Sequence, residues 1–373
     1  MGDKGHPSQE RGIEALVVDD SAFMRAVISD ILERNGISVA AEAADGHEAV
    51  EAVETIRPDV ITMDLQMPRM DGLKAVEVIM HRRPTPILVL SSHAGDDADI
   101  TFEALSRGAV DFFTKPGGEV SADLATVEDR LIKTIKSVAA STPPTPSHGE
   151  GDDNRPFDAI LTDNAPILAI ASSTGGPSVV ERILSDLPVE AGFRVLIVQH
   201  MPESFTERFA ARLNRASDYT ITEAHDGARI GPGEGVVAPG GFHLLVDHLT
   251  DETVTVTLDD GEPVHNVKPA ADVTFDSLAR FEPACAVGAV VTGMGADGAA
   301  GSRSLSDRGA TIVAQDEETS VVFGMPQRTI ENGCVDTIAP LDGLTQAIVS
   351  AVTPDVPPEL TAPSKGSTGG DHP

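Results

Sequence analysis

The sequence has few aromatic side chains and almost no cysteine: 373 residues include no Trp, one Tyr and two Cys. Two cysteines, Cys285 and Cys334, cannot build the disulfide framework that is typical of small secreted domains. No His/Cys spacing in the chain is typical of a zinc site. We therefore expect both cysteines to be reduced packing residues.

Long hydrophobic runs are also lacking. Apolar stretches such as Val195–Val198 and Ala286–Val291 are too short to span a bilayer and are typical of buried strands. The N-terminus has no apolar segment after its charged residues, which argues against a signal peptide. We expect a soluble, cytoplasmic protein without membrane insertion, and the length predicts two or three domains.

Basic residues are scarce. Lys and Arg number 27 against 59 Asp and Glu, which gives a formal net charge of −32. Such a surface repels nucleic acid and anionic membranes, so we exclude nucleic acid as a partner. The acidic residues are spread along the chain, a pattern that suits high salt, where charges are screened within about 3 Å at 1 M. We hypothesise a halophilic source.

Hydrophobic patterning divides the chain into two α/β parts. Residues 13–140 alternate short β-rich runs with helical patterns, and five such βα units predict a parallel sheet wrapped by helices. Asp45 followed by Glu48 indicates a capping box at the start of one helix. The predicted strands are 15–18, 39–43, 60–63, 87–90 and 111–114.

A second α/β pattern occupies residues 165–353. The segment 141–164 between the two patterns is expected to be a linker, because it begins with a stretch rich in Pro, Ser, Gly and Asp. Residues 1–12 and 354–373 are expected to be disordered. The predicted fold class is α/β, with two doubly wound parallel-sheet domains joined by a flexible linker.

Carboxylates follow two strands of the first domain. Asp19 and Asp20 end the first strand and Asp64 ends the third, and the carboxyl ends of parallel strands converge at one crevice. Such oxygens suit Mg²⁺. Ser91 and Lys115 end the fourth and fifth strands, so the set suits an aspartyl phosphate on Asp64. Each acid alone could simply cap the next helix, but five converging groups favour the phosphate site.

Three motifs in this part resemble those of a known family. "VVDDSAFMR" (17–25), "MDLQMPRMDG" (63–72) and "TKP" (114–116) resemble a response-regulator receiver domain, which has a flavodoxin-like fold. The resemblance implies a Mg²⁺ cofactor and a histidine kinase as phosphodonor. It also implies the site residues: Asp64 as phosphoacceptor, Asp19, Asp20 and the Gln66 carbonyl as further metal ligands, Ser91 as switch hydroxyl, Lys115 as phosphate contact and Phe112 as aromatic switch.

In the second domain, a serine, a histidine and an aspartate each come just after an apolar strand. Ser173 lies in a Ser-Thr-Gly-Gly turn, His200 follows the next strand, and Asp297 lies in a later Gly-rich turn. The strand ends of a parallel sheet can bring all three to one crevice. There His200 would activate the serine and Asp297 would orient the imidazole. Taken singly, they could be a helix cap, a strand-end histidine and a turn former.

Two other readings of the second domain remain. Gly293, Gly295 and Gly298 fit a dinucleotide-binding fingerprint, with Asp316 about 20 residues on. Asp297 falls inside that motif, close to where a pyrophosphate would pack, and the serine and histidine are left without a role. A non-enzymatic scaffold is the other alternative, but all three members of the triad are present.

The motifs of this domain resemble the catalytic domain of chemotaxis protein-glutamate methylesterases, the CheB family. They are "STGGP" (173–177), "VQHMP" (198–202), "APGGFHL" (238–244), "TGMGADG" (292–298) and "AQDEETSVVFGMP" (314–326). The resemblance implies a Rossmann-like serine hydrolase without a cofactor in this domain. Its implied residues are Ser173 as nucleophile, His200 as base, Asp297 as orienting acid, and Thr174 and Met294 at the oxyanion.

The resemblance implies an activity as well. The enzyme would be a carboxylic-ester hydrolase that removes γ-methyl esters from glutamates of chemotaxis receptors, releases methanol and also deamidates receptor glutamines, in chemotactic adaptation. The unphosphorylated receiver would cover the catalytic crevice, and phosphorylation at Asp64 would uncover it.

A few further side chains have no settled role. Arg208, Arg212 and Arg215 share one side of an expected helix and could meet an acidic receptor surface. Pairing with nearby acids and with the helix dipole is the favoured interpretation. His243 and His265 are noted without a role.

Overall fold

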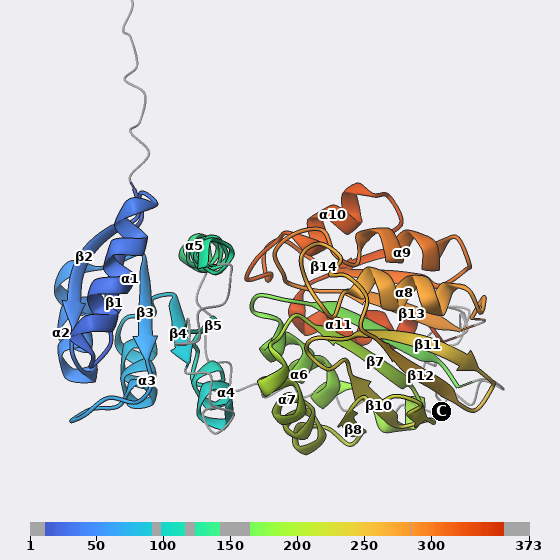
Figure 1. The fold of residues 1–373 in the computed structure, drawn as a ribbon. Helices are drawn as coiled ribbons and strands as arrows, with labels where there is room; N and C mark the ends of the chain where they lie inside the picture. The colour runs from blue at the N-terminus through green and yellow to red at the C-terminus, as the bar shows by residue number, and fades with distance from the viewer. Residues whose placement is uncertain (1–11, 92–97, 116–123, 142–164, 284, 354–373) are drawn as a thin grey trace, which may run out of the picture.

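The computed structural model describes residues 12–91, 98–115, 124–141, 165–283 and 285–353. In Figure 1 these residues form two α/β units that lie side by side. The predicted disordered ends and nearly all of the predicted linker lie outside the described residues. No helix in the described ranges is long and apolar enough to cross a membrane.

The first unit is built on a parallel sheet with the strand order β2-β1-β3-β4-β5, which is the doubly wound order that the sequence predicts. All five predicted strands are confirmed. The strands are β1 (Glu14–Val18), β2 (Ser38–Ala43), β3 (Val60–Asp64), β4 (Ile87–Ser91) and β5 (Asp111–Thr114), and the helices are α1 (Ala22–Arg34), α2 (Gly46–Ile56), α3 (Gly72–Arg82), α4 (Ala98–Ser106) and α5 (Leu124–Ala140).

Local sequence explains where these helices begin. Asp45 caps α2 by accepting hydrogen bonds from the N–H groups of His47 and Glu48, at 2.7 and 3.0 Å. The Glu48 carboxylate accepts a bond in return from the Ala44 N–H at 2.8 Å. The predicted capping box is therefore present, displaced by one residue at its return bond.

The second unit has a parallel sheet with the strand order β15-β14-β13-β6-β7-β10-β8. Its strands are β6 (Ile167–Ser172), β7 (Arg194–Gln199), β8 (Thr220–Glu223), β10 (Glu234–Val237), β13 (Ala286–Val290), β14 (Thr311–Gln315) and β15 (Thr337–Ala339). Its helices are α6 (Gly176–Asp186), α7 (Glu203–Ala216), α8 (Ala271–Ala279), α9 (Ala299–Ser306), α10 (Met325–Glu331) and α11 (Leu341–Ser350), with a short 3-10 helix at Val189–Ala191.

One element of this unit was not predicted. An antiparallel ribbon of β11 (His243–Leu249), β12 (Val254–Asp259) and β9 (Arg229–Ile230) adds a small second sheet. The ribbon packs on α8 through β11. The ribbon covers part of one face of the parallel sheet, and α6, α7 and α11 pack on the opposite face. The long connection between β10 and α8 therefore has a packing role.

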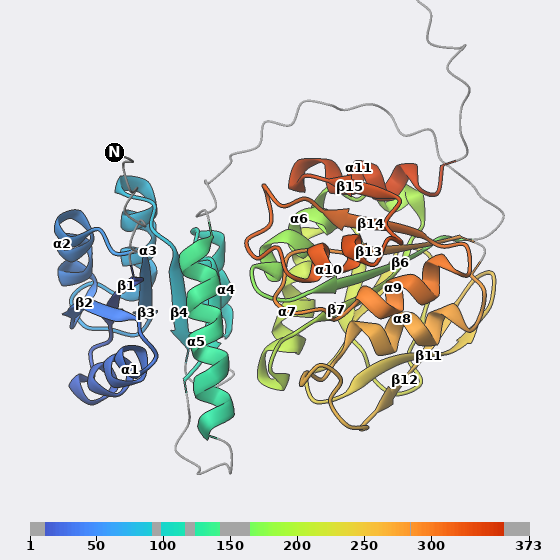
Figure 2. The ribbon, with the colours of Figure 1, turned by 90° about the horizontal axis from the view of Figure 1, so that it is seen from above.

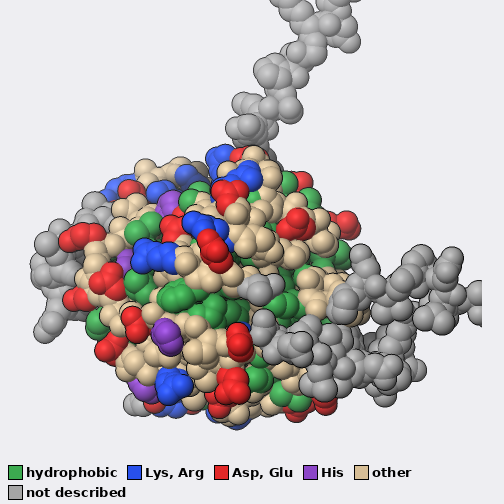
Figure 3. All heavy atoms as spheres, turned by 90° about the vertical axis from the view of Figure 1, so that its right-hand side faces the viewer, with side chains coloured by type: hydrophobic (Ala, Val, Ile, Leu, Met, Phe, Trp, Pro, Cys, Tyr) green, Lys and Arg blue, Asp and Glu red, His purple; other side chains and the backbone are tan. Residues whose placement is uncertain are grey.

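The two units touch through helices. In both Figure 1 and Figure 2, α4 lies on the side of the first unit that faces the second, and it packs on α7 and α6. Buried residues of both units join in one hydrophobic cluster. On the face that Figure 3 shows, acidic side chains are scattered, with basic ones among them. This distribution agrees with the spread of acid along the sequence.

Candidate functional site

The acidic crevice of the first unit forms at the carboxyl ends of β1 and β3. Carboxylate oxygens of Asp19, Asp20 and Asp64 all lie within 4.8 Å of one another. Lys115 Nζ lies 2.7 Å from Asp19 Oδ2 and 3.0 Å from Asp64 Oδ1. Asp20, Asp64 and Lys115, with Gln66 and Ser91, line a hollow of about 310 Å³. The structure therefore brings the predicted acids, hydroxyl and ammonium together.

Charge and burial act on Asp64 in opposite directions. Burial raises the pKa of its carboxyl, Lys115 lowers it, and the negative charge of Asp19 raises it again, so that the net direction is upward. Lys115 thus places its single positive charge between two carboxylates. An oxygen-rich pocket with excess negative charge suits a divalent cation such as Mg²⁺.

Ser91 links this pocket to α4. The Thr101 hydroxyl, on the second turn of that helix, donates a hydrogen bond to Ser91 Oγ at 2.9 Å. Phe112, the predicted aromatic switch, lies on the neighbouring strand β5 and is half-buried. The next residue of α4, Phe102, lies edge-on to Phe112 with 6.1 Å between ring centroids. Helix α4 therefore connects the acidic pocket to the side of the first unit that faces the second unit.

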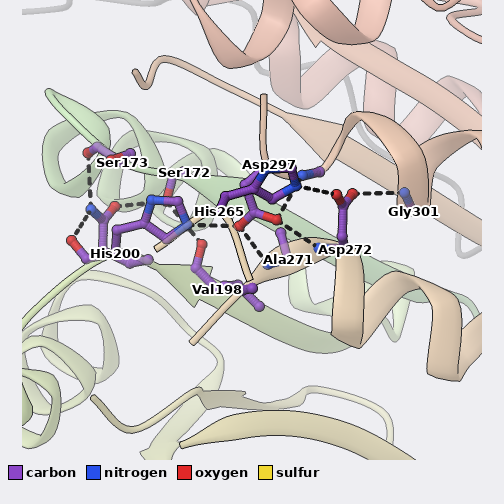
Figure 4. Close-up of polar contacts among 12 residues, drawn as sticks. Ser172, Ser173, Val198, His200, His265, Ala271, Asp272, Asp297 and Gly301 are labelled. Carbon is purple, nitrogen blue, oxygen red and sulfur yellow. Dashed lines mark hydrogen bonds and ion pairs between the residues drawn. The ribbon is translucent and has the colours of Figure 1, made fainter. Parts of the chain in front are cut away.

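The second crevice forms where three adjacent strands end. The sheet places β13, β6 and β7 side by side, and Asp297, Ser173 and His200 follow these strands in the same order. Strand adjacency is the reason that residues so distant in sequence meet. Figure 4 shows the His200 ring between the turn of Ser173 and the carboxylate of Asp297.

Glycine at two positions allows the serine turn to form. Gly175, the residue before α6, has φ +73°, a left-handed conformation that side chains rarely adopt. A Cβ on Gly293 would lie 2.8 Å from Ser173 Cβ and 2.4 Å from Met325 Sδ. The Gly293–Met294 segment therefore passes directly against the serine, which agrees with a place for Met294 beside it.

His200 and Asp297 form a close pair. His200 Nε2 lies 2.7 Å from Asp297 Oδ2. Since the carboxylate accepts from Nε2–H, the Nδ1 atom is left to accept a proton. The Ser173 hydroxyl makes no hydrogen bond to another described residue. The histidine and the acid are thus already aligned.

Four N–H groups hold the Asp297 carboxylate. Its oxygens accept from His200 Nε2 and from the backbone of Ala271 (2.6 Å), Asp272 (2.9 Å) and Gly298 (3.0 Å). Burial alone would raise its pKa, but the hydrogen bonds and charge of His200 and the backbone bonds hold the pKa below its usual value. Asp297 is therefore an ionised partner for the imidazole.

Several residues of this site were missed. Gln199 Nε2 donates to the carbonyl oxygens of Ser173 (2.9 Å) and His200 (3.2 Å), and Gln199 Oε1 accepts from Ser172 Oγ at 2.6 Å. The amide thereby holds the Ser173 and His200 segments together. Its only signal in the sequence is a polar residue at the end of an otherwise apolar strand.

A second His–Asp pair lies next to the first. His265 Nε2 lies 2.7 Å from Asp272 Oδ2, and Asp272 Oδ1 accepts from the Gly301 N–H at 2.7 Å (Figure 4). His265 has φ 54°, in a two-residue turn between Val264 and Val267. Nitrogen and oxygen atoms of His265, Asp272 and Asp297 lie within 4.8 Å of one another. Because N–H groups already engage these carboxylate oxygens, the cluster is a hydrogen-bond network.

This network also argues against dinucleotide binding. The N-terminus of α9, where a pyrophosphate would be held, is already satisfied by carboxylates: Gly298 N–H by Asp297 and Gly301 N–H by Asp272. A bound pyrophosphate would have to displace both. The glycine pattern is explained by the tight turn, since Gly295 and Gly298 have φ +97° and +87°.

The remaining noted side chains make local contacts. His243 is buried and bridges the Glu262 carbonyl (3.0 Å) and the Ala270 N–H (3.2 Å), so it shapes the connection before α8. Arg212 pairs with Glu181 at 2.8 Å, as the favoured interpretation expects. Arg208 pairs with Asp99 of the other unit at 2.9 Å.

Asp111 connects the two units at the serine turn. This buried residue begins β5, and its carboxylate is hydrogen-bonded to the Thr174 side chain and the Gly175 backbone. Burial is the main cause that raises the pKa of Asp111 to about 7, while these bonds and the one from the Phe112 backbone act in the opposite direction. The predicted oxyanion residue Thr174 is thus in contact with the first unit.

Comparison with known families agrees with this geometry. A family model for the response regulator receiver domain matches residues 15–123, and one for CheB methylesterase matches residues 168–348. A protein-glutamate methylesterase/protein-glutamine glutaminase of Haloarcula marismortui is 48% identical over 365 residues, which cover 92% of this chain and 99% of that protein.

The chain belongs to the CheB methylesterase family.

A second CheB relative has the same extent. The protein of that name from Halobacterium salinarum is 51% identical over 341 residues, 91% of this chain and 98% of the relative. Among solved structures, the Thermotoga maritima CheB catalytic domain matches with 38% identity and a TM-score of 0.48, covering 50% of this chain and 98% of that one. The predictions of a receiver fused to a CheB domain, and of a methylesterase, are confirmed by these family matches. Both sequence relatives come from halophiles, in agreement with the excess of acidic residues.

Proposed function

We propose that this chain is a phosphorylation-activated protein-glutamate methylesterase that acts on chemotaxis receptors and also deamidates their glutamines. The observation that carries the proposal is the His200–Asp297 pair at 2.7 Å beside the turn of Ser173. The names of the CheB relatives supply both activities and the glutamate and glutamine substrates. In this proposal residues 13–140 are the regulatory unit and residues 165–353 the catalytic unit, in the cytoplasm.

The ester would be hydrolysed in two steps. Ser173 Oγ attacks the γ-carbonyl carbon while its proton moves to His200 Nδ1, and Asp297 stabilises the imidazolium through Nε2–H. Backbone N–H groups at Thr174 and Met294 would bind the oxyanion, and one such donor is typically worth about 3 kcal/mol. When the carbon–methoxy bond breaks, His200 returns the proton to the leaving oxygen and methanol departs.

Water completes the reaction. His200 takes a proton from water, which attacks the acyl-enzyme carbon, and returns that proton to Ser173 Oγ as the acyl–Oγ bond breaks and the receptor glutamate leaves. For a glutamine substrate, ammonia leaves in place of methanol, and the same acyl-enzyme follows. The open geometry between Ser173 and His200 is compatible with this chemistry, because catalytic hydrogen bonds often tighten only with substrate bound.

The first unit would control this crevice. Asp64 would accept a phosphoryl group from a histidine kinase, and Lys115 and Ser91 would bind its oxygens. Asp19, Asp20, Asp64 and the Gln66 carbonyl would hold Mg²⁺, which supplies charge neutralisation for the transferring phosphoryl group. A shift of Ser91 would reach Thr101 and with it α4, the helix that packs on the catalytic unit.

The test is methanol release from methylated receptor membranes at high salt, with and without a small phosphodonor and Mg²⁺. We expect release that rises with phosphodonor and disappears in Ser173→Ala. Release that persists in Ser173→Ala would overturn the assigned nucleophile. Release that does not respond to phosphodonor would overturn the regulatory part alone.

A further inference from the structure

Helix α7 carries a mixed aromatic and basic face next to the catalytic histidine. Phe205, Arg208, Phe209 and Arg212 follow one another at helical spacing, so they share one side of the helix. The helix begins at Glu203, three residues after His200. The first turn of this side of α7 therefore lies close to His200 in the chain. We call these four residues the α7 face.

In the described structure α4 of the receiver covers the α7 face. The Phe102 ring stacks on Phe209 with 5.7 Å between centroids and lies edge-on to Phe205 at 6.1 Å. Asp99 pairs with Arg208 at 2.9 Å, and Ser106 accepts a hydrogen bond from Arg212. The three α4 residues have the spacing i, i+3, i+7. One side of α4 thus contacts the α7 face with an acid, an aromatic ring and a hydroxyl in turn.

Removal of the receiver would uncover the part of this face that lies beneath it. Phe205 and Phe209 are fully buried here, partly beneath Phe102. A contiguous apolar patch on a free surface typically marks an interaction site. Release would also deprive Arg208 of its carboxylate partner. The exposed face would favour a partner that supplies apolar side chains and a carboxylate.

We propose that the α7 face is the docking surface for the substrate-bearing helix of the receptor, and that α4 occupies it as an intramolecular substitute. The inference rests on the proposed receptor demethylation. A receptor segment that carries glutamates and their methyl esters offers the carboxylate that Asp99 supplies in the closed molecule. Arg208 is the main contact for that carboxylate, because Arg212 retains Glu181 at 2.8 Å.

The two ends of one ion pair provide the test. In the full chain, Asp99→Lys and Arg208→Glu both turn the Asp99–Arg208 attraction into repulsion. Both should therefore raise the rate on a small soluble substrate, N-acetylglutamate γ-methyl ester, by a similar factor without phosphodonor. On methylated receptor membranes they should differ: Asp99→Lys should raise methanol release, whereas Arg208→Glu should stay about fivefold or more below Asp99→Lys.

Arg229→Glu is the matched control, because it makes the same charge change at an exposed residue of β9, outside α7 and its α4 contacts. It should match the unmodified chain on both substrates. Equal receptor rates for Asp99→Lys and Arg208→Glu would overturn the docking surface while leaving the proposed function in place. Absence of methanol release in every variant, Asp99→Lys included, would overturn the proposed function on which the inference depends.

Discussion

The ring of Phe112, on the last strand of the receiver sheet, stacks on the ring of Phe205 at the start of α7, with 4.6 Å between centroids and 27° between planes. Phe112 is the predicted aromatic switch, and Phe205 lies five residues after His200, the proposed catalytic base. The stack joins the expected regulatory side chain directly to the helix that follows His200. A rotation of Phe112 would therefore change the contact between the units.

Phe112→Ala should raise basal esterase activity. An aromatic pair contributes about 0.5–1.5 kcal/mol beyond its area, so its loss should increase the open fraction and the basal rate by about two- to tenfold. The measurement is methanol release without phosphodonor. Phe23→Ala, which removes a 74% exposed ring from the receiver, is the control and should leave the rate unchanged. Equal rates for the two variants would contradict the role of the stack.

Asp111 should make the closed state sensitive to pH. Docking raises the pKa of this carboxyl to about 7, so the closed form keeps a proton that a solvent-exposed Asp would lose near its ordinary value. The free-energy contribution of this proton to the closed form is therefore fully present below the ordinary pKa of Asp and is lost as the pH rises through about 7. The ratio of basal to phosphodonor-activated rate should therefore rise between about pH 5 and 7.

Asp111→Asn provides the control for that prediction. The amide has nearly the same shape and no charge, so the ratio should become flat over the same range. A pH-dependent ratio that persists unchanged in Asp111→Asn would assign the effect to another group.

Asp297→Asn should nearly abolish the esterase. The amide presents a donor where Nε2–H of His200 needs an acceptor, and the corresponding change in a serine protease triad lowers kcat by about 10⁴-fold. Asp272→Asn is the matched variant, since it alters a neighbouring buried carboxylate that does not touch His200. Its kcat should fall far less. Because both acids bind backbone N–H groups, rates should be normalised to the folded fraction measured by circular dichroism.

Asp64→Asn should separate basal from stimulated activity. The variant has no carboxylate to phosphorylate, so phosphodonor and Mg²⁺ should no longer raise the rate, while the unstimulated rate should stay within about twofold of the original. A phosphodonor response that survives would place the phosphoacceptor elsewhere. Radiolabel from phosphodonor on the intact chain and on the variant measures the site directly.

Stability should increase with salt. A net charge of −32 makes the folded chain repel itself, and the screening length falls from about 10 Å at 0.1 M to about 3 Å at 1 M. The melting temperature followed by circular dichroism should therefore rise steadily from dilute buffer to molar KCl. A melting temperature independent of salt would argue against adaptation to high salt.

Much of the fold could be predicted from the sequence because parallel strands have a strong local signature. Short apolar runs with polar residues at their carboxyl ends identified β1, β3, β6 and β7. The same rule placed Ser173, His200 and Asp297 at one edge, since a parallel sheet aligns its strand ends. The receiver acids followed for the same reason.

Other features depend on contacts that leave no periodic signal. Asp111 meets Thr174 only because two folded surfaces dock, and no local pattern predicts which strand faces the partner. Asp272 supports Asp297 through its backbone N–H in the first turn of α8. The antiparallel ribbon lies in a connection for which no strands were predicted from the sequence. The choice of Nε2 as the atom that faces Asp297 depends on side-chain orientation, which spacing does not encode.

Because α4 and the α7 face belong to one polypeptide, they associate within one molecule. The fraction of molecules in which they are associated therefore does not depend on the protein concentration, but on the effective concentration of α4 near the α7 face. Contacts too weak to hold two separate molecules together can then keep the enzyme closed, since a short tether typically supplies an effective concentration of about millimolar. The sequence predicts a flexible linker between the two units, and the length of such a linker would set the resting rate. Each lengthening of that predicted linker would lower the local concentration of α4 roughly as the −3/2 power of its length, without altering a single catalytic atom.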